Sequence, residues 1–272
     1  MSEACPGNAA QGQGCRVMGI LNVTPDSFSD GGRFADPDVA VRRAATLIAD
    51  GADIIDIGGE STRPGSTPIS WEEEWSRVEP VLKGINSQLS TLNSKLSTLN
   101  IKLSIDTYHP ETAERAVALG VTIVNCVYEE PIPAMLGILA ANPEVELVMP
   151  AKSFPALHSP FPPLLGHRLR RLASLGGYVP RIYLDPMIGF GTTREEDLAL
   201  LRSVPELAKK GRVLVGASRK RIVRALAGEE STVSLLGGDI AIALWSMAHG
   251  ASVVRVHDVK EVAQALRVYR KI

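Results

Sequence analysis

The sequence has few cysteines, few aromatic residues, almost no net charge and no long apolar segment. Its three cysteines, Cys5, Cys15 and Cys126, are widely spaced, which predicts neither a disulfide framework nor a cysteine-rich metal site. That pattern is typical of a reducing compartment, so we expect a cytoplasmic protein. No run approaches the roughly 20 apolar residues of a membrane-spanning helix, so we expect no membrane partner.

The charge balance restricts the class of partner further. The formal net charge is −1, from 29 Lys and Arg against 30 Asp and Glu. Without an excess of positive charge we expect no nucleic acid as the main partner. Residues 1–16 contain Gly, Ala, Gln and Asn but no apolar core, so we interpret them as a disordered or loosely ordered tail and not as a signal peptide.

What the sequence does contain is a regular alternation of short apolar strands and helices over residues 17–272. The strands are expected at 17–21, 54–57, 103–105, 121–124, 145–149, 181–184, 213–215 and 252–256. Alternation predicts a parallel α/β sheet, and eight repeats in this length are typical of a (β/α)₈ TIM barrel forming a single domain. A doubly wound open sheet is the alternative that periodicity leaves open.

One connection stands out as an insertion of low complexity. A helix is expected over 71–85, followed by a connection over 86–102 that contains two copies of a seven-residue repeat, at 89–95 and 96–102. Leu recurs there at coiled-coil spacing, but two heptads are too few for a coiled coil, and Ser, Thr and Asn are poor helix formers. We therefore expect a surface excursion without a chemical role.

Polar residues follow the expected strands, where the face of a barrel that carries the active site lies. They are Asn22, Thr62, Arg63, Asp106, Asn125, Asp185, Ser218, Arg219, Lys220, Arg255 and His257. Only the fifth strand has no such residue after it. Solvated loops would be the alternative explanation, but the convergence of so many amides, carboxylates and cations favours a binding site.

The types of these residues predict the chemistry of the ligand. Arg63, Lys220, Arg255 and His257 are donors that suit a phosphorylated substrate. The carboxylates and Asn125 suit the edge of a flat heterocycle, which a carboxylate can hold with two hydrogen bonds. Ser218 is expected to cap a helix that begins near Arg219, with a helix N-terminus that attracts a carboxylate or phosphate.

Two long segments, 18–32 and 51–65, resemble the signature segments of the dihydropteroate synthase family. Four shorter motifs, at 104–107, 185–191, 216–220 and 255–258, resemble further motifs of that family in the right order. The resemblance implies a (β/α)₈ barrel that joins 7,8-dihydropterin-6-ylmethyl diphosphate to 4-aminobenzoate and releases diphosphate, in folate biosynthesis. It also implies Mg²⁺ as a cofactor and a homodimer.

The resemblance further implies a role for each matched residue. Asn22 resembles the protein ligand of the metal. The diphosphate contacts are implied to be Thr62, Arg63, Arg255 and His257. The pterin contacts are implied to be Asp106, Asn125, Asp185 and Lys220, with Phe190 also binding substrate. Ser218 and Arg219 lie where the carboxylate of 4-aminobenzoate is expected. Those implied to be catalytic are Arg63, Asp106, Lys220, Arg255 and His257.

The sequence departs from the family pattern at three positions. Cys126 replaces the Asp that usually follows the Asn after the fourth strand. Pro150 replaces a His after the fifth strand, and Thr192 replaces a Lys. Two alternatives therefore stay open: a pterin-binding paralogue that is non-catalytic or altered in specificity, and a folate-binding barrel of the methyltransferase type.

Overall fold

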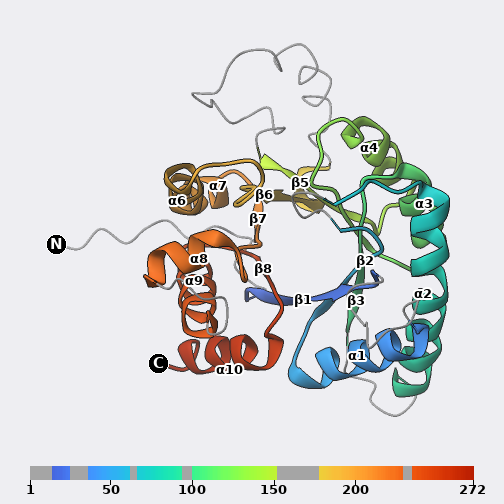
Figure 1. Cartoon of the computed structure of the whole chain (residues 1–272), viewed down its shortest axis with the longest axis horizontal. Helices are drawn as coiled ribbons and strands as arrows, with labels where there is room; N and C mark the ends of the chain where they lie inside the picture. Colours follow the sequence, from blue (N-terminus) through green and yellow to red (C-terminus); the bar gives the residue numbers. More distant parts are fainter. Residues whose placement is uncertain (1–13, 25–35, 62–65, 94–99, 152–177, 229–234) are drawn as a thin grey trace.

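The computed structural model describes residues 14–24, 36–61, 66–93, 100–151, 178–228 and 235–272, and within them eight parallel strands form a closed barrel (Figure 1). The strands are β1 (Arg16–Asn22), β2 (Ile54–Gly58), β3 (Lys102–Asp106), β4 (Ile123–Asn125), β5 (Glu146–Pro150), β6 (Ile182–Asp185), β7 (Arg212–Val215) and β8 (Val253–Val256). Met18 of β1 lies in register with Ile54 of β2 and with Arg255 of β8, which closes the barrel. The predicted TIM barrel is confirmed, and the open sheet is excluded.

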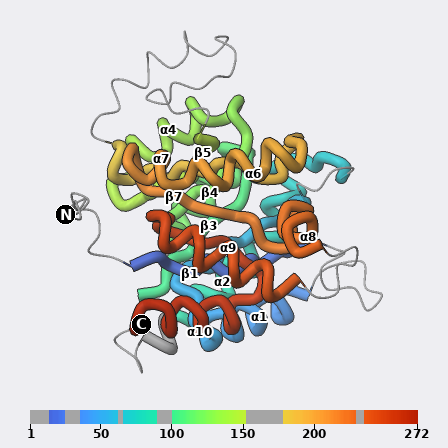
Figure 2. The backbone as a smooth tube through the Cα atoms, turned by 90° about the vertical axis from the view of Figure 1, so that its left-hand side faces the viewer, coloured from blue at the N-terminus to red at the C-terminus, as the bar shows by residue number. Residues whose placement is uncertain are grey.

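Helices surround the barrel (Figures 1 and 2). They are α1 (Pro37–Asp50), α2 (Trp71–Asn93), α3 (Pro110–Ala118), α4 (Ile132–Ala141), α6 (Arg194–Arg202), α7 (Val204–Ala208), α8 (Arg221–Ala227), α9 (Leu236–Ala248) and α10 (Val259–Tyr269), with a 3₁₀ turn, η5 (Val179–Arg181). Local signals set the ends of α1. The Asp36 side chain accepts a hydrogen bond from the Asp38 N–H, and Gly51 ends the helix at φ 104°.

The inside of the barrel is divided into layers because successive side chains of a strand point to opposite faces. Seven buried side chains form an apolar middle layer, separate from the larger core between strands and helices. They are Met18, Ile54, Ile123, Val148, Tyr183, Leu214 and Val253. Two residues earlier or later along most of these strands, one or both of the inward positions are polar, with Arg16, Glu146 and Arg212 towards one end and Asp56, Asn125, Asp185 and Arg255 towards the other. The polar layer near the C-terminal ends of the strands therefore lies on an apolar floor.

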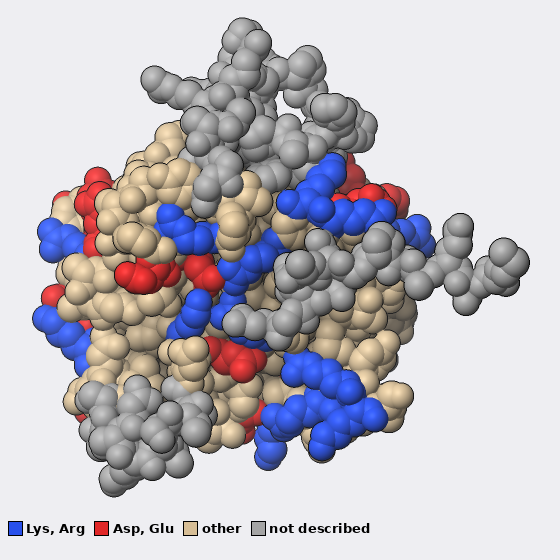
Figure 3. Space-filling model, turned by 180° about the vertical axis from the view of Figure 1, so that it is seen from behind, with Lys and Arg blue, Asp and Glu red and all other residues tan. Residues whose placement is uncertain are grey.

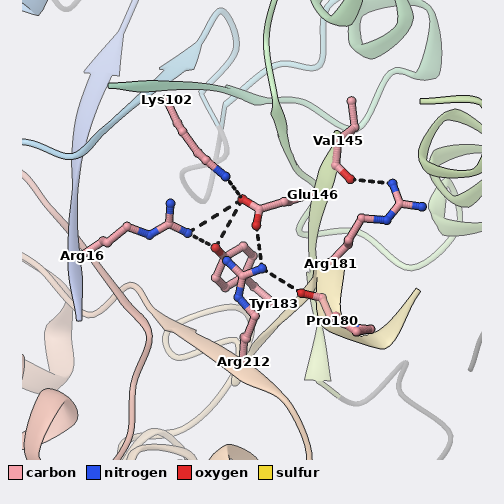
Figure 4. A network of polar contacts seen from close by, with 8 residues as sticks. All are labelled: Arg16, Lys102, Val145, Glu146, Pro180, Arg181, Tyr183 and Arg212. Atoms are coloured by element: carbon pink, nitrogen blue, oxygen red, sulfur yellow. Dashed lines mark hydrogen bonds and ion pairs between the residues drawn. The ribbon is translucent and has the colours of Figure 1, made fainter. Parts of the chain in front are cut away.

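The layer at the N-terminal ends of the strands is an ionic cluster around Glu146 (Figure 4). Lys102 donates to Glu146 Oε2 at 2.8 Å and Arg212 to Oε1 at 2.5 Å. Arg16 lies 3.8 Å from Oε2 and also donates to the Tyr183 hydroxyl. Burial alone would raise the pKa of Glu146, but the hydrogen bonds from Lys102 and Arg212 lower it overall. The Tyr183 hydroxyl also donates to Oε2, at 3.3 Å, so the charged carboxylate of β5 is joined to β1, β3, β6 and β7 at this end.

The surface carries charges of both signs. On the side of the molecule turned away in Figure 1, Lys and Arg side chains gather near the middle, with Asp and Glu side chains beside them (Figure 3). This interspersion agrees with the net charge of −1.

Two expected boundaries are wrong. The N-terminal tail was expected over 1–16, but Cys15 is buried and Arg16 begins β1; residues 1–13 lie outside the described part of the chain. The helix expected over 71–85 continues to Asn93, so the connection expected over 86–102 is partly helical. Leu89 packs against the core between strands and helices, and this tertiary contact outweighs the poor helix propensity of the polar residues around it.

Deleting residues 89–95 should leave the rate of diphosphate release within about threefold, which is under 1 kcal/mol on the barrier scale. The connection lies at the N-terminal face of the barrel, opposite the site, and after the deletion Leu96 takes the place of Leu89 behind Gln88. Steady-state kinetics and thermal melts of the deletion variant would check this. A large loss of activity in a variant that still melts cooperatively would contradict it.

Candidate active site

The polar layer at the C-terminal ends of the strands is organised around Arg255 of β8. Its Nε donates to Asp56 Oδ2 at 2.6 Å, and its Nη2 donates to Asp106 Oδ2 at 2.5 Å. Asn125 donates through Nδ2 to the same oxygen of Asp56 at 3.0 Å. One arginine thus connects residues from β2, β3 and β4 across the top of the apolar layer.

Asp56 is a central residue that the sequence analysis missed. It was included in an apolar strand, yet its side chain is fully buried and points into the barrel. A signal was present: a single carboxylate interrupts the apolar run of β2, at a position of the same parity as Ile54. In a barrel strand that parity assigns both side chains to the interior.

Burial and charge together set the ionisation of this cluster. Burial raises the pKa of Asp106 to about 7, against the attraction of Arg255 and with further repulsion from Asp56. Burial alone would lower the pKa of Arg255, but Asp56 and Asp106 raise it above its usual value. Arg255 is therefore a permanent cation in the centre of the site.

A second group lies after β6 and β7. The Asp185 carboxylate accepts from the Met187 N–H at 2.6 Å, where the chain turns with φ 67°. Lys220 donates to the Ile188 carbonyl at 2.6 Å, and its ammonium lies 4.4 Å from the centre of the Phe190 ring. Burial lowers the pKa of Lys220 to about 8, although Asp185 acts in the opposite direction. Burial also raises the pKa of Asp185.

The turn that carries Phe190 is tied to α6 by Asp197, which the sequence analysis also missed. Asp197 Oδ1 accepts from the Gly189 N–H at 2.7 Å and from the Thr192 hydroxyl, and Oδ2 accepts from Arg221 at 3.1 Å. Thr192, one of the three departures, thus has a local role in holding this turn.

The other two departures remove a polar group each. The Cys126 side chain is buried, and burial raises the pKa of its thiol to about 12, so the position is uncharged. Pro150 ends β5 in register with Asp185 of β6. The wall formed by β4 and β5 is therefore less polar than the family pattern implies.

Ser218 does not cap a helix, which corrects the expectation. The helix α8 begins at Arg221, with Lys220 at the N-cap and no side-chain capping bond. The Ser218 hydroxyl instead donates to Asp239 of α9 at 2.9 Å and lies 3.1 Å from His257 Nδ1. Tertiary contacts with α9 thus direct the hydroxyl away from the nearby backbone N–H groups.

The remaining expected residues lie at the edge of the described site. Arg219 forms an ion pair with Asp258, at 2.7 Å between Nη2 and Oδ1. Asn22 ends β1 in register with Gly58 and is half-buried. Thr62 and Arg63 lie outside the described residues. In the part of the chain that the structure describes, no three His, Cys, Asp or Glu side chains converge on one metal position.

The sequence is similar to proteins of known family. The model of the pterin binding enzyme family matches residues 18–257. The dihydropteroate synthase of Neisseria meningitidis serogroup B is 38% identical over 94% of this chain and 92% of its own length. The chain belongs to the dihydropteroate synthase family.

Solved structures of the family superpose on the barrel. Dihydropteroate synthase from Xanthomonas albilineans in complex with 7,8-dihydropteroate has a TM-score of 0.73 and 33% identity, covering 94% of this chain and 93% of that one. The same enzyme with 4-aminobenzoic acid has a TM-score of 0.74 and 34% identity over the same shares. Family membership makes this chain a transferase of folate biosynthesis. No helix among the described residues is long and apolar enough to span a membrane.

Proposed function

We propose that this chain joins 7,8-dihydropterin-6-ylmethyl diphosphate to 4-aminobenzoate and releases diphosphate. The observation that carries the proposal is the polar layer above the apolar floor of the barrel, where Asp56, Asp106, Asn125, Asp185 and Lys220 surround Arg255. Such a layer offers acceptors for the N–H edge of a heterocycle together with a permanent cation. The relatives named above support the choice of substrates.

The pterin is proposed to lie between Asp185, Asn125 and Lys220. Asn125 Oδ1 is buried and has no hydrogen-bond partner among the described residues, so it is available to a ligand N–H. Lys220 lies over the Phe190 ring, which places its ammonium beside a flat surface. A pterin ring there would satisfy the acceptors and stack against an aromatic residue.

Departure of diphosphate needs its negative charge neutralised. Arg255 and His257 of the described site are proposed to meet it, together with Thr62 and Arg63. The ion pairs with Asp56 and Asp106 orient the Arg255 guanidinium before substrate arrives, so little reorganisation is needed at the moment of reaction. The carbon from which diphosphate departs becomes electron-poor and is stabilised by the electron-rich pterin ring.

The residues present fit Mg²⁺ as a cofactor held mainly by substrate. Mg²⁺ binds oxygen ligands, keeps several waters and commonly uses one or two protein groups with substrate phosphates. Asn22 supplies a suitable amide oxygen at the end of β1, and the lack of a cluster of three carboxylate, His or Cys ligands in the described residues agrees with this mode. When bound, the ion would neutralise the leaving diphosphate.

The arylamine is a modest nucleophile, so placing it matters more than a strong base. The guanidinium of Arg219, in the turn with Ser218, is proposed to hold its carboxylate. The proposed reaction requires no nucleophilic side chain activated by a base, because the arylamine itself attacks the carbon.

The deciding experiment is diphosphate release from the purified protein, with and without 4-aminobenzoate. Pterin binding without release would instead indicate the non-catalytic paralogue.

Lys220→Ala and Asp185→Asn should each weaken pterin binding by roughly 1.5–3 kcal/mol, since each removes a charged partner of a buried heterocycle edge. Calorimetry with a pterin that lacks the diphosphate would measure this. Glu195→Gln, an exposed change at the start of α6, serves as the control. Unchanged affinity in both site variants would mean that the pterin lies elsewhere.

We further propose a cytoplasmic homodimer. The supporting feature is an apolar groove of about 550 Å³ between α6, α8 and α9, lined in part by the 53%-exposed Leu226. A second copy of the chain would remove this apolar surface from water. Leu226→Glu should shift the protein towards monomer in sedimentation; an unchanged oligomeric state would place any contact elsewhere.

A further inference from the structure

Asp239 of α9 lies outside every motif that carries the family resemblance, yet its side chain reaches the site. Only 4% of the residue is exposed. Its Oδ1 and Oδ2 both accept from the Arg219 N–H, at 3.0 and 3.2 Å, and Oδ2 also accepts from the Ser218 hydroxyl. A buried carboxylate with these partners acts on two consecutive residues of the loop between β7 and α8.

The backbone at Arg219 needs such support. Its φ of 59° lies in the left-handed region, which residues other than glycine rarely adopt. The N–H held by Asp239 belongs to this residue, so the carboxylate stabilises the unusual turn. A second carboxylate, Asp258, holds the guanidinium of the same residue from the other side. The position of the loop therefore depends on α9 as well as on the turn between β8 and α10.

The hydrogen bonds of Ser218 also decide a tautomer. A serine hydroxyl has one hydrogen, and an ionised carboxylate can only accept. Since that hydrogen goes to Asp239, Ser218 must act as acceptor towards His257 Nδ1, at 3.1 Å, and towards the His257 backbone N–H, at 3.3 Å. Nδ1 of His257 therefore carries a hydrogen.

We propose that Asp239 is a positioning residue of the active site, which fixes the Ser218–Arg219 turn and, through the Ser218 hydroxyl, the hydrogen on Nδ1 of His257. The inference rests on the proposed function, in which the turn that carries Arg219 meets the carboxylate of 4-aminobenzoate and His257 meets diphosphate. Asp239 touches neither substrate in this arrangement. It positions the turn and the ring that do.

The small space around Asp239 determines which substitutions at this position can test the proposal. The carboxylate borders a cavity of about 10 Å³ that Ser218, Ile242 and Ala243 also line, which is room for one water molecule at most. Asn has the shape of Asp and fits without repacking. However, Asn replaces one acceptor oxygen by an NH₂ donor and removes the negative charge, so it cannot keep all three hydrogen bonds that the two carboxylate oxygens accept from Arg219 and Ser218.

Asp239→Asn should raise the KM for 4-aminobenzoate by about tenfold or more, the effect of losing a hydrogen bond to a charged group. The affinity for a diphosphate-free pterin should stay unchanged. In ¹⁵N-edited NMR, the ring of His257, assigned by comparison with His257→Gln, should lose its dominant Nδ1–H form. Asp239→Ala should have the same effects on the KM and on the His257 ring. If Asp239→Ala does not fold, Asp239→Asn alone tests the proposal.

Glu146→Gln is the matched control, because Glu146 is a buried carboxylate at the opposite end of the barrel (Figure 4). It should lower the melting temperature without changing the KM for 4-aminobenzoate or the His257 ring signals. An unchanged KM and an unchanged tautomer in Asp239→Asn would overturn the inference. If the parent protein releases no diphosphate, the proposed function fails, and the NMR comparison still decides whether Asp239 sets the tautomer.

Discussion

Arg255→Met should lower the free energy of unfolding by about 3–5 kcal/mol, the cost of removing one partner from a buried ion pair. Asp56 is fully buried and the Asp106 side chain is 17% exposed, and both accept hydrogen bonds from this guanidinium. Without it, Asp56 would lose its cationic partner and the pKa of Asp106 would rise further above its present value of about 7. Chemical denaturation of parent and variant would measure the difference, and diphosphate release should fall with it.

Two further variants show whether the cost of Arg255→Met comes from the burial of its ion pairs or from the loss of any charge. Arg219→Ala breaks an ion pair whose arginine side chain is 56% exposed, so it should cost less than about 1 kcal/mol. Adding Asp106→Asn to Arg255→Met should recover part of the lost stability, because it removes the carboxyl group whose repulsion of Asp56 is no longer offset by Arg255. A loss below about 1 kcal/mol in Arg255→Met would contradict the buried ion-pair cluster.

Removing Mg²⁺ should reduce turnover by roughly a hundredfold or more, because a bound metal ion contributes several kcal/mol of charge stabilisation to the departing group. The fold should not change, since the ion is proposed to meet the protein mainly through Asn22 and to bind otherwise to substrate oxygens and water. The measurement is diphosphate release after chelation and after Mg²⁺ is restored, with melting curves at each stage.

Asn22→Ala provides the residue-level check on the metal. It should raise the Mg²⁺ concentration needed for half-maximal activity and leave the affinity for a diphosphate-free pterin as in the parent. Unimpaired release in the presence of excess chelator would show that the cations of the chain suffice and that Asn22 has another role.

The architecture and much of the site could be predicted because both depend on local patterns. The alternation of apolar runs with helices predicted the barrel, and its topology requires that residues after the strands share one face. The residues so identified include Asp106, Asn125, Asp185 and Lys220, which the structure does place together. The sequence by itself therefore determined the fold class, the family and the end of the barrel that carries the site.

Only the tertiary structure decided how the charged groups are paired. Asp56 and Arg255 are 199 residues apart, and Ser218 is held by a helix 21 residues further along the chain. Local rules assigned Asp56 to an apolar strand and Ser218 to a helix cap, since neither the strand alternation nor the capping pattern includes a partner from another strand or helix. The extension of α2 has the same cause, because the contact of Leu89 with the core outweighs weak local helix propensity. Hydrogen-bond and ion-pair partners inside a closed barrel are set by strand register and burial, which exist only once the barrel has formed.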